Sequence, residues 1–453
     1  MRTKLFSLLF LWPALLPSAS ALGLLDIYAL AQKKDPAFQA ARQDYLAGVE
    51  NENLGRAGLL PSVSLSYQNG LRNWQSSKTP QAKSLFSKQT HTVTQHRQYQ
   101  SQSGSVMLTQ PLYDPEAWAR YQTGKAQSIL SEANWNAKSM ELAVRVVNHY
   151  LDVMLAQDQL RLLTEQRTTW QQQLLQNQRM LQTGEGTVTE VVETEARLAM
   201  TDAELIAAQD NLDKARRVLE SMTGQSGVSV TQLDKLAAGP LKPLKLVPAS
   251  FEQWQALALK NNAELAAARQ QINIHYYQTE QQRAGFLPRI QLYASHGLNN
   301  SSSDTTIDQR YKTTSVGVQL NYSLYAGGYN SAALRQVSAL YNKSKYDLEQ
   351  ITHDTLSNMS QVFHQCHNAE QRLSAYAQAV HSTELQITAI REGIKAGQRT
   401  NVDLLNARQQ FYNTRLELTK EKHEYIRAWL MLQYYSGQLT PDSLTTIARY
   451  FVK

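Results

Sequence analysis

The sequence contains two copies of one pattern, 227 residues apart, and this duplication restricts the folds that the chain can adopt. Residues 56–61 read RAGLLP, and residues 283–288 read RAGFLP. In both copies the proline is followed by an alternating apolar and polar run, a polar stretch, a second alternating run and a long helical segment. Self-similarity on this scale indicates duplication of a whole structural unit.

The first 21 residues have the pattern of a secretory signal peptide. Arg2 and Lys4 precede an apolar run at residues 5–16, and residues 19–21 (ASA) fit a signal-peptidase site. We therefore expect a signal peptide at residues 1–21. A membrane anchor is the alternative, but the run is shorter than the ~20 apolar residues of a spanning helix.

Charge and cysteine content exclude several classes of protein. The formal net charge is +7, and the lysines and arginines are scattered without a basic block, which argues against nucleic-acid binding. Cys366 is the single cysteine, so no internal disulfide can form. It also lies far from the expected cleavage site, which excludes a lipid-modified N-terminal cysteine there.

Alternating residues predict two strands in each repeat. The strand at 62–72 begins SVSLSY, with serine on one face and Val, Leu and Tyr on the other. A polar stretch at 73–100 is typical of a loop, and a second strand is expected at 103–113. In the second repeat, strands are expected at 289–298 and 313–325.

Long helices are expected after each pair of strands. The first repeat should contain helices at 115–181 and 189–222, and the second at 329–396 and 402–436. At ~1.5 Å per residue the longer ones are rods of roughly 100 Å. Gly124, isolated within the first rod, is expected to be tolerated.

These elements divide the chain into regions. The first repeat covers 22–223, and a connector rich in glycine and proline covers 224–249. The second repeat covers 250–436, and residues 437–453 form a C-terminal tail.

Both shorter helices carry a seven-residue repeat, and the two sets are 213 residues apart. Such a repeat predicts a left-handed coiled coil with the preceding long helix, although an ordinary helical hairpin is an alternative. The residues are Val191, Leu198, Leu205, Leu212 and Leu219 in the first repeat, and Leu404, Phe411, Leu418, Tyr425 and Leu432 in the second.

Four strands with one apolar face cannot close a barrel within one chain. We suppose that the apolar face meets lipid and the polar face meets water. Closing the sheet into a barrel then removes its edges, whose backbone N–H and C=O groups would have no hydrogen-bond partner in hydrocarbon. Two copies would give eight strands and a lumen filled by side chains, whereas three would give twelve strands and a usable pore. We therefore favour a homotrimer; a soluble sheet with one polar face is the alternative.

Taken together, these motifs resemble the TolC family of outer-membrane channels. The resemblance rests on the two strand entries at 56–61 and 283–288, the Leu-Tyr pair that ends a strand in each repeat, and the G-x-x-T helix turns at Gly184 and Gly397. It covers essentially all of the chain after residue 21. The chain looks most similar to the branch that serves type I protein secretion, such as the alkaline-protease exporters.

The resemblance implies a membrane α/β fold. In the expected homotrimer, a 12-stranded transmembrane β-barrel with four strands per chain continues into a 12-helix periplasmic α-barrel with coiled-coil tips. The chain would be a passive exit duct in the outer membrane and not an enzyme, and would need no cofactor and no metal. Its implied partners are outer-membrane lipid, a periplasmic adaptor, an inner-membrane ABC transporter and exported protein cargo. Small-molecule efflux is one alternative, and a secreted coiled-coil scaffold or adhesion protein is another.

The resemblance also assigns a gate at the periplasmic tip. Arg399 aligns with the family's locking arginine, and Thr189 and Glu190 align with its acceptors, so a charge-assisted pair between Arg399 and Glu190 is expected. Asp403 aligns with the first constriction aspartate, whereas Asn406 replaces the second. Solvated charges at helix ends are the alternative interpretation.

The turns beside this gate are expected to receive the adaptor. Gly184, Thr187, Gly397 and Thr400 occupy these turns, although simple helix termination would also place glycine there. Ile394 stands where the family has a latch tyrosine, so the resemblance does not carry this latch hydrogen bond over to the chain.

His364, Cys366 and His367 do not predict a metal site, although they are close in sequence. Cys366 lies on a different side of a helix from His364. A structural role is expected for all three.

Overall fold

The computed structural model of the chain describes residues 23–80, 92–224, 233–237, 239–301 and 306–452, so the expected signal peptide lies outside the described residues. These residues form two compact units. The sheet unit comprises Asp44–Asn134 and Glu264–Ile351, and the coil unit comprises the residues up to Gln43, Trp135–Ala263 and the residues from Thr352 onward. Both repeats contribute to both units.

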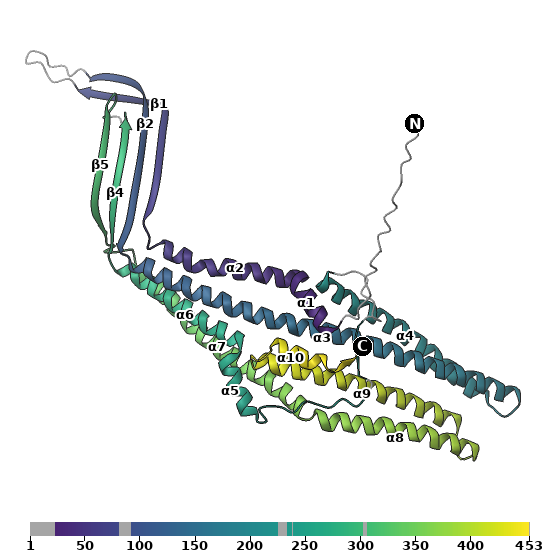
Figure 1. Cartoon of the computed structure of the whole chain (residues 1–453). Helices are drawn as coiled ribbons and strands as arrows, with labels where there is room; N and C mark the ends of the chain where they lie inside the picture. Colours follow the sequence, from purple (N-terminus) through teal and green to yellow (C-terminus); the bar gives the residue numbers. More distant parts are fainter. Residues whose placement is uncertain (1–22, 81–91, 225–232, 238, 302–305, 453) are drawn as a thin grey trace, which may run out of the picture. The chain divides into compact units, whose positions relative to one another are not determined.

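The sheet unit contains a four-stranded antiparallel sheet in the order β1-β2-β4-β5 (Figure 1). Its strands are β1 (Ser62–Pro80), β2 (Thr92–Tyr113), β4 (Arg289–Asn300) and β5 (Arg310–Asn321). Each repeat supplies two neighbouring strands, and β1 and β5 form the edges. The first repeat therefore pairs with the second through β2 and β4.

The first hairpin is longer than the sequence predicted. The expected loop at 73–100 is largely strand, because β1 continues to Pro80 and β2 begins at Thr92. Pairing continues through a bulge between Gly70 and Asn73. Backbone hydrogen bonds between strands need no apolar side chains, so a polar sequence exposed to water can still form a ladder.

The strand expected at 313–325 lies earlier in the chain. β5 starts at Arg310 and ends at Asn321, which pairs with Arg289, the first residue of β4. Pro288 comes just before Arg289 and cannot donate a backbone hydrogen bond, which accounts for the end of the ladder. Tyr322 and the residues up to Tyr325 therefore lie outside the strand.

Two helices of the first repeat approach closely within the sheet unit. α2 (Pro36–Ala57) runs beside the first part of α3 (Pro115–Gln182) (Figure 1). A Cβ added at Gly124 would lie 2.3 Å from the backbone oxygen of Asn51, and one added at Gly55 would lie 2.9 Å from the Cα of Tyr121. Gly124 is thus required by the packing of the two backbones, which corrects the expectation that it is merely tolerated. The second-repeat helices of this unit are α6 (Ala263–Arg283), the 3-10 turn η2 (Ala284–Phe286) and the start of α7 (Tyr329–His367).

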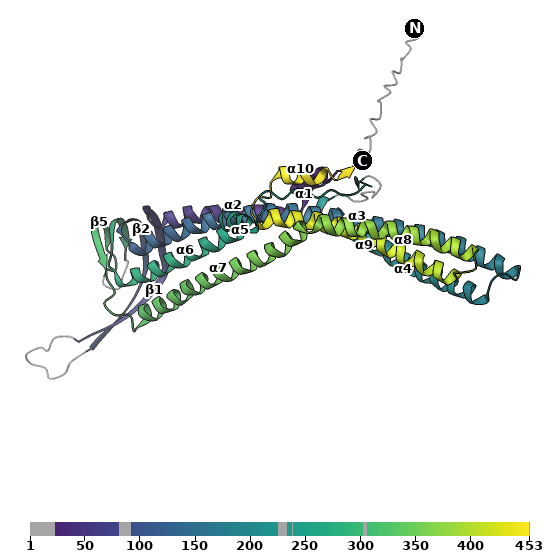
Figure 2. The ribbon, with the colours of Figure 1, turned by 90° about the horizontal axis from the view of Figure 1, so that it is seen from below.

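The coil unit is built around four long helices that run side by side (Figure 2). They are the distal part of α3, α4 (Val188–Thr223), α8 (Ala369–Lys395) and α9 (Asn401–Tyr435). Smaller elements pack with them: α1 (Leu24–Lys34), α5 (Phe251–Asn261), α10 (Pro441–Ala448), and β3 (Lys235–Leu236), which pairs with β6 (Phe451–Val452). The C-terminal tail and part of the connector are therefore structured.

The heptad residues of α4 and α9 are all buried or half-buried. A second stripe follows three residues later along each helix, which gives the a and d positions of a coiled coil. This second stripe is buried too, and contains Thr194, Thr201 and Ala208 in α4, and Ala407, Thr414, Glu421 and Ala428 in α9. Threonine and alanine at these positions allow the helices to lie close together.

The helix expected at 329–396 is divided into α7 and α8 at Asn368. This residue keeps right-handed helical angles (φ −90°, ψ −1°), so the interruption is confined to one residue. Asparagine competes with the helical backbone for hydrogen bonds, which makes it a natural point of interruption. Within the described residues, every helix is too short or too polar to cross a bilayer.

Candidate functional site

Two matching helix turns form the tip of the coil unit. Gly184 follows the end of α3 and Gly397 follows the end of α8, with φ of 79° and 73°. The N–H groups of Gly184 and Glu185 bond to Leu181 O and Met180 O, and those of Gly397 and Gln398 bond to Ile394 O and Gly393 O. Both turns are Schellman motifs, in which glycine adopts the left-handed conformation without steric cost. A Cβ at either glycine would meet nothing within 4 Å, so both turns present bare backbone.

The helix that follows each turn begins with a capping box. The Thr187 hydroxyl accepts from Glu190 N (3.3 Å), and the Glu190 carboxylate accepts from Thr187 N (3.0 Å). Thr400 and Asp403 make the same reciprocal pair, at 3.2 Å and 3.0 Å. Two of the expected gate acids therefore satisfy backbone donors at helix starts.

The two tips are joined by hydrogen bonds between the repeats. The Asn401 amide donates to the second oxygen of Glu190 at 2.7 Å, and Arg197 donates to the Asn406 side chain at 2.7 Å. Among the described ion pairs, none joins Arg399 to Glu190, so the expected pair is not formed within the chain. The carboxylate of Glu190 is instead occupied by Asn401 and by its own cap.

Arg399 lies along a groove between α8 and α9. A Cβ added at Gly393 would lie 2.8 Å from Cγ of Arg399, so the arginine stem passes directly over this glycine. The groove has a volume of about 620 Å³ and is lined by Arg399, Asp403, Asn406 and Gln410, among others. The structure thus brings three of the expected gate residues, Arg399, Asp403 and Asn406, to one surface, while Thr189 is exposed near the start of α4.

The pKa of Asp403 lies below its ordinary value. The Thr400 backbone N–H is the largest cause and the Thr400 hydroxyl the next, and the charge of Arg399 contributes further. Because these groups favour the carboxylate, Asp403 is negatively charged at neutral pH. The groove therefore carries adjacent opposite charges.

Ile394 packs into a small apolar cluster at the same tip. Its neighbours include the buried residues Ile390, Leu404 and Ala407. The side chain that replaces the family tyrosine thus contributes to holding α8 against α9 instead of offering a hydroxyl.

A polar seam between α3 and α9 was not predicted from the sequence. Its bonds run in antiparallel order: Arg408 to Gln173 (2.9 Å), Tyr412 to Thr169 (2.8 Å), Arg415 to Glu165 (2.7 Å) and Arg427 to Asp152 (2.5 Å). Because each bond joins one repeat to the other, the seam fixes the alignment of the two repeats.

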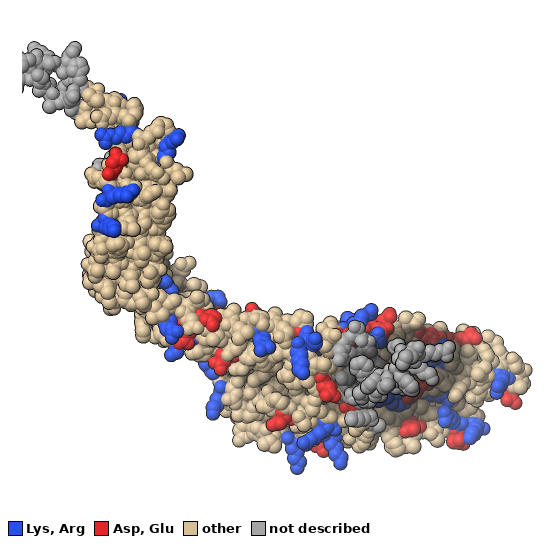
Figure 3. All heavy atoms as spheres, turned by 45° about the horizontal axis from the view of Figure 1, so that its top comes forward, with Lys and Arg blue, Asp and Glu red and all other residues tan. Residues whose placement is uncertain are grey.

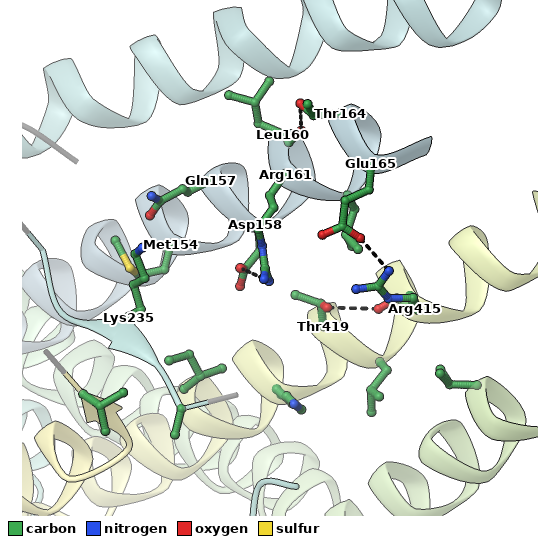
Figure 4. A pocket seen from close by; sticks show the side chains of 17 residues that line it. Met154, Gln157, Asp158, Leu160, Arg161, Thr164, Glu165, Lys235, Arg415 and Thr419 are labelled. Atoms are coloured by element: carbon green, nitrogen blue, oxygen red, sulfur yellow. Dashed lines mark hydrogen bonds and ion pairs between the residues drawn. The ribbon is translucent and has the colours of Figure 1, made fainter. Parts of the chain in front are cut away.

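A larger hollow of about 870 Å³ opens beside this seam, between α3, α9 and β3 (Figure 4). Four of its charged residues form two ion pairs, Arg161 with Asp158 at 2.9 Å and Arg415 with Glu165 at 2.7 Å, and Lys235 and Lys422 also line it. These paired charges leave no convergent set of acid, base and nucleophile, so the hollow does not have the composition of a catalytic centre.

Cys366 belongs to an apolar core and not to a chemical site. It packs with Trp254, Met359 and Phe363, and burial raises its pKa to about 12. A thiol with a raised pKa is a poor nucleophile and a poor metal ligand. Within the described residues, no cluster of three potential metal-ligating side chains occurs.

Sequence reasoning missed Asn177, Asn401 and Arg197 as tip residues. Asn177 is buried and donates to the Thr194 hydroxyl at 2.9 Å, and Arg197 lies over the Trp170 ring at 5.9 Å. Polar residues at buried heptad positions, such as Thr194, were a usable signal for such bonds. The partner of each bond lies on another helix and could not be read from spacing.

Comparison with known proteins agrees with this architecture. Residues 27–225 and 254–438 match the family model described as outer membrane efflux protein. The two matched segments correspond to the two repeats and leave out most of the connector.

Two relatives are similar over nearly the whole chain. The alkaline protease secretion protein AprF of Pseudomonas aeruginosa is 40% identical over 435 residues, which cover 96% of this chain and 88% of AprF. The proteases secretion protein PrtF of Dickeya chrysanthemi is 37% identical over 434 residues, which cover 96% of this chain and 92% of PrtF.

Solved structures share the fold at lower identity. The crystal structure of CusC superposes with a TM-score of 0.76 at 16% identity, covering 92% of each chain. VceC of Vibrio cholerae gives a TM-score of 0.72 at 16% identity, covering 91% of this chain and 96% of VceC. These matches confirm the family resemblance: the chain belongs to the outer membrane efflux protein family, which also contains TolC, and is an outer-membrane transport protein and not an enzyme.

Proposed function

We propose that this protein is the outer-membrane exit duct of a type I secretion system and that its cargo is a protease-like protein. The observation that carries the proposal is its similarity, over 96% of the chain, to two proteins named for protease secretion. The duct would be passive. A periplasmic adaptor would recruit it, and an inner-membrane ABC transporter would supply the energy.

The two faces of the sheet support a barrel formed by three chains. On one face, Val63, Leu108, Ala294 and Val316 are paired across all four strands in a single row. On the other face, Ser62 bonds to Thr109 at 2.7 Å and Ser66 to Ser105 at 2.8 Å. An apolar outer face and a hydroxyl-lined inner face suit a wall between lipid and water.

The edges of the sheet support the same assembly. In the described part of the chain, β1 and β5 have one neighbouring strand each. Joining β5 of one copy to β1 of the next would satisfy both edges, and three copies would close twelve strands around an aqueous lumen. The long helices of three chains would then form a tunnel of twelve helical segments.

The groove at the α8–α9 tip supports a gate there. Arg399, Asp403 and Asn406 line this groove, while Thr189 and Glu190 lie at the start of α4. In the trimer these residues would ring the narrow end of the tunnel, with one carboxylate of Asp403 from each chain. Asp403→Ala should weaken block of the channel by multivalent cations; unchanged block would remove Asp403 from the constriction.

The two bare turns support adaptor docking. Gly184 and Gly397 expose backbone, and Thr187 and Thr400 flank them at equivalent places. A helical hairpin of the adaptor could pack against such turns without displacing side chains.

Small-molecule efflux is the second candidate. The family model that matches the chain is named for efflux, which is the observation in its favour. Protein secretion is preferred because the relatives at 37–40% identity are named for protease secretion.

Deletion of the gene in its own host distinguishes the two functions. Secretion predicts that extracellular protease falls while dye accumulation is unchanged, and that the intact gene restores protease export. Increased dye accumulation with normal protease export would overturn the secretion proposal and favour efflux. In planar bilayers the purified protein should give rare, small openings under either function.

A further inference from the structure

The charges of the β-sheet are all of one sign. β1, β2, β4 and β5 contain no aspartate or glutamate, but contain six lysine or arginine residues. Arg289, at the end of the sheet beside the helices, is paired with Glu116 at 3.1 Å. The other five lie toward the hairpin ends: Arg72, Lys78, Arg97, Arg310 and Lys312.

Figure 3 shows this segregation within the sheet unit. Lysine and arginine atoms gather over the sheet at the end away from the helices, and the part next to the helices is free of them on the visible face. Asp308, in the β4–β5 connection, is the one acidic residue that the structure describes there. Among the described residues, five cations and one acid lie at this end of the sheet, which therefore carries a net positive charge; Asp304 lies outside the described residues.

Strand register places two of these cations on the apolar face of β5. Val318 and Val316 pair with Leu292 and Ala294, and continuing the alternation by two-residue steps brings Lys312 and then Arg310 to the same face. Lys312 pairs with Leu298 and Arg310 with Asn300, and both cations are exposed. The face thus changes from apolar to cationic along a single strand.

The position of this change is comparable with the thickness of a membrane. From Leu320 to Lys312 is eight residues, or about 26 Å along the strand, which a strand tilt of about 40° reduces to roughly 20 Å of height. The apolar band of outer-membrane barrels is about 25 Å tall. With the helices on the periplasmic side, Lys312 and Arg310 lie at the level of the outer-leaflet headgroups.

The longer hairpin adds one cation, Lys78, and one aromatic residue, Trp74, on the same outer face. The register pairs Trp74 with Gln98, Ser76 with His96 and Lys78 with Thr94, and Trp74 and Lys78 are both exposed. Arg97 pairs with Gln75 and points to the opposite face, together with Gln95, to which it donates. Trp74 has the amphipathic ring that suits a membrane interface.

From this arrangement we infer that the outer face of the sheet binds the phosphate groups of the glycolipid that forms the outer leaflet, with Lys312 and Arg310 as the main contacts. The inference rests on the proposed barrel and on its orientation. The inference names one lipid as the partner of this surface. Hydrophobic burial alone would not favour one headgroup over another. Charge complementarity selects phosphorylated lipid, because cations that form no ion pair with any other described residue attract anionic headgroups.

Binding of fluorescent lipid A to the full-length protein in detergent micelles tests this inference. The probes are bisphosphorylated lipid A and its dephosphorylated form. Each cation near an anionic surface contributes about a fivefold change in affinity. We expect Lys312→Gln to weaken binding of bisphosphorylated lipid A about fivefold, Lys312→Gln with Arg310→Gln roughly 20-fold, and dephosphorylated lipid A to bind weakly to all forms.

Arg97→Gln is the matched control, since it removes one charge from the opposite face, and it should change binding less than about twofold. Equal affinity of wild type and double variant for bisphosphorylated lipid A would overturn the inference, as would equal binding of the two lipids to wild type. Channel conductance, measured on the same samples, shows that each variant is folded. If the wild-type protein conducts but binds both forms of lipid A equally, this inference alone is refuted. If the wild-type protein does not conduct, the proposed function is refuted.

Discussion

Several tip residues serve local structure and the contact between repeats at once. The Glu190 carboxylate caps α4 through Thr187 N and also accepts from Asn401. Asp403 caps α9 through Thr400 N and also faces the groove that contains Arg399. Because one carboxylate serves two partners, a change at the cap also changes the contact between the hairpins.

Asn401→Ala should loosen the closed tip. The substitution removes a 2.7 Å hydrogen bond to a carboxylate at a buried position, and such bonds contribute about 1.5–3 kcal/mol. We expect open probability in planar bilayers to increase at least about tenfold. Asn413→Ala makes the same substitution at an exposed residue of α9, whose side chain accepts a hydrogen bond from Gln409 of the same helix, and should leave gating unchanged. Equal open probabilities for Asn401→Ala and wild type would show that this bond does not hold the gate.

The start of α9 should depend on pH through Asp403. Its pKa is lowered in the folded protein, so the carboxylate stabilises the helix start above its unfolded pKa. That stabilisation is lost as the pH falls through the lowered pKa, below about 4. Hydrogen exchange, corrected for intrinsic rates, should show protection of the first turn of α9 at pH 5 and loss of protection below pH 4. In Asp403→Asn this pH dependence should be absent; the same dependence in both proteins would assign the effect to another group.

At the scale of elements, the packing of α2 against α3 depends on glycine. Gly55 and Gly124 bring the two backbones together, and a Cβ at Gly124 would approach Asn51 O to 2.3 Å. Backbone cannot move as a flexible side chain can, so any added atom must separate the helices.

Gly124→Ala should therefore destabilise the protein, although alanine is the better helix former. Overpacking of this kind costs about 1–3 kcal/mol, which should appear as a lower temperature of heat-induced trimer dissociation in detergent. Gly58→Ala is a control from the same region, because its Cβ would lie at an ordinary 3.5 Å from Gly55 O. An unchanged dissociation temperature for Gly124→Ala would contradict the close approach.

Alternation in the sequence predicted the strand segments that have one apolar face. It did not predict the segments in which both faces are polar. Residues 62–72 were recognised by alternation, but the extension of β1 to Pro80 has no such pattern. Its pairing is set by backbone hydrogen bonds and by the partner strand, which single-sequence periodicity does not report. The helices were easier because glycine marks their ends through the left-handed conformation at Gly184 and Gly397.

The candidate site could be placed from the sequence, but its contacts could not. The G-x-x-T turns and the heptads located the tip, because these signals depend on local backbone geometry. The bond of Glu190 to Asn401 and that of Arg197 to Asn406 join residues about 210 positions apart. Each helix carries several polar side chains, and the rotation and axial position of the two helices decide which of them meet. These two quantities cannot be read from the sequence.

At the scale of the whole molecule, the duplication accounts for the assembly that we propose. Each repeat supplies two strands and a pair of long helices, and the two repeats meet along β2–β4 and along the α3–α9 seam. The free edges of β1 and β5 can then each pair with one further copy of the chain. The proposed trimer repeats, between chains, the side-by-side pairing that already joins the two repeats within one.

The measurement that tests this account most directly is a cryo-EM map of the full-length protein in lipid nanodiscs. The account predicts three chains around one axis, with β5 of each chain hydrogen-bonded to β1 of the next and the row containing Val63 and Val316 facing lipid. A single chain with its sheet edges covered by its own segments, or an assembly in which Ser62 and Ser66 face lipid, would contradict it.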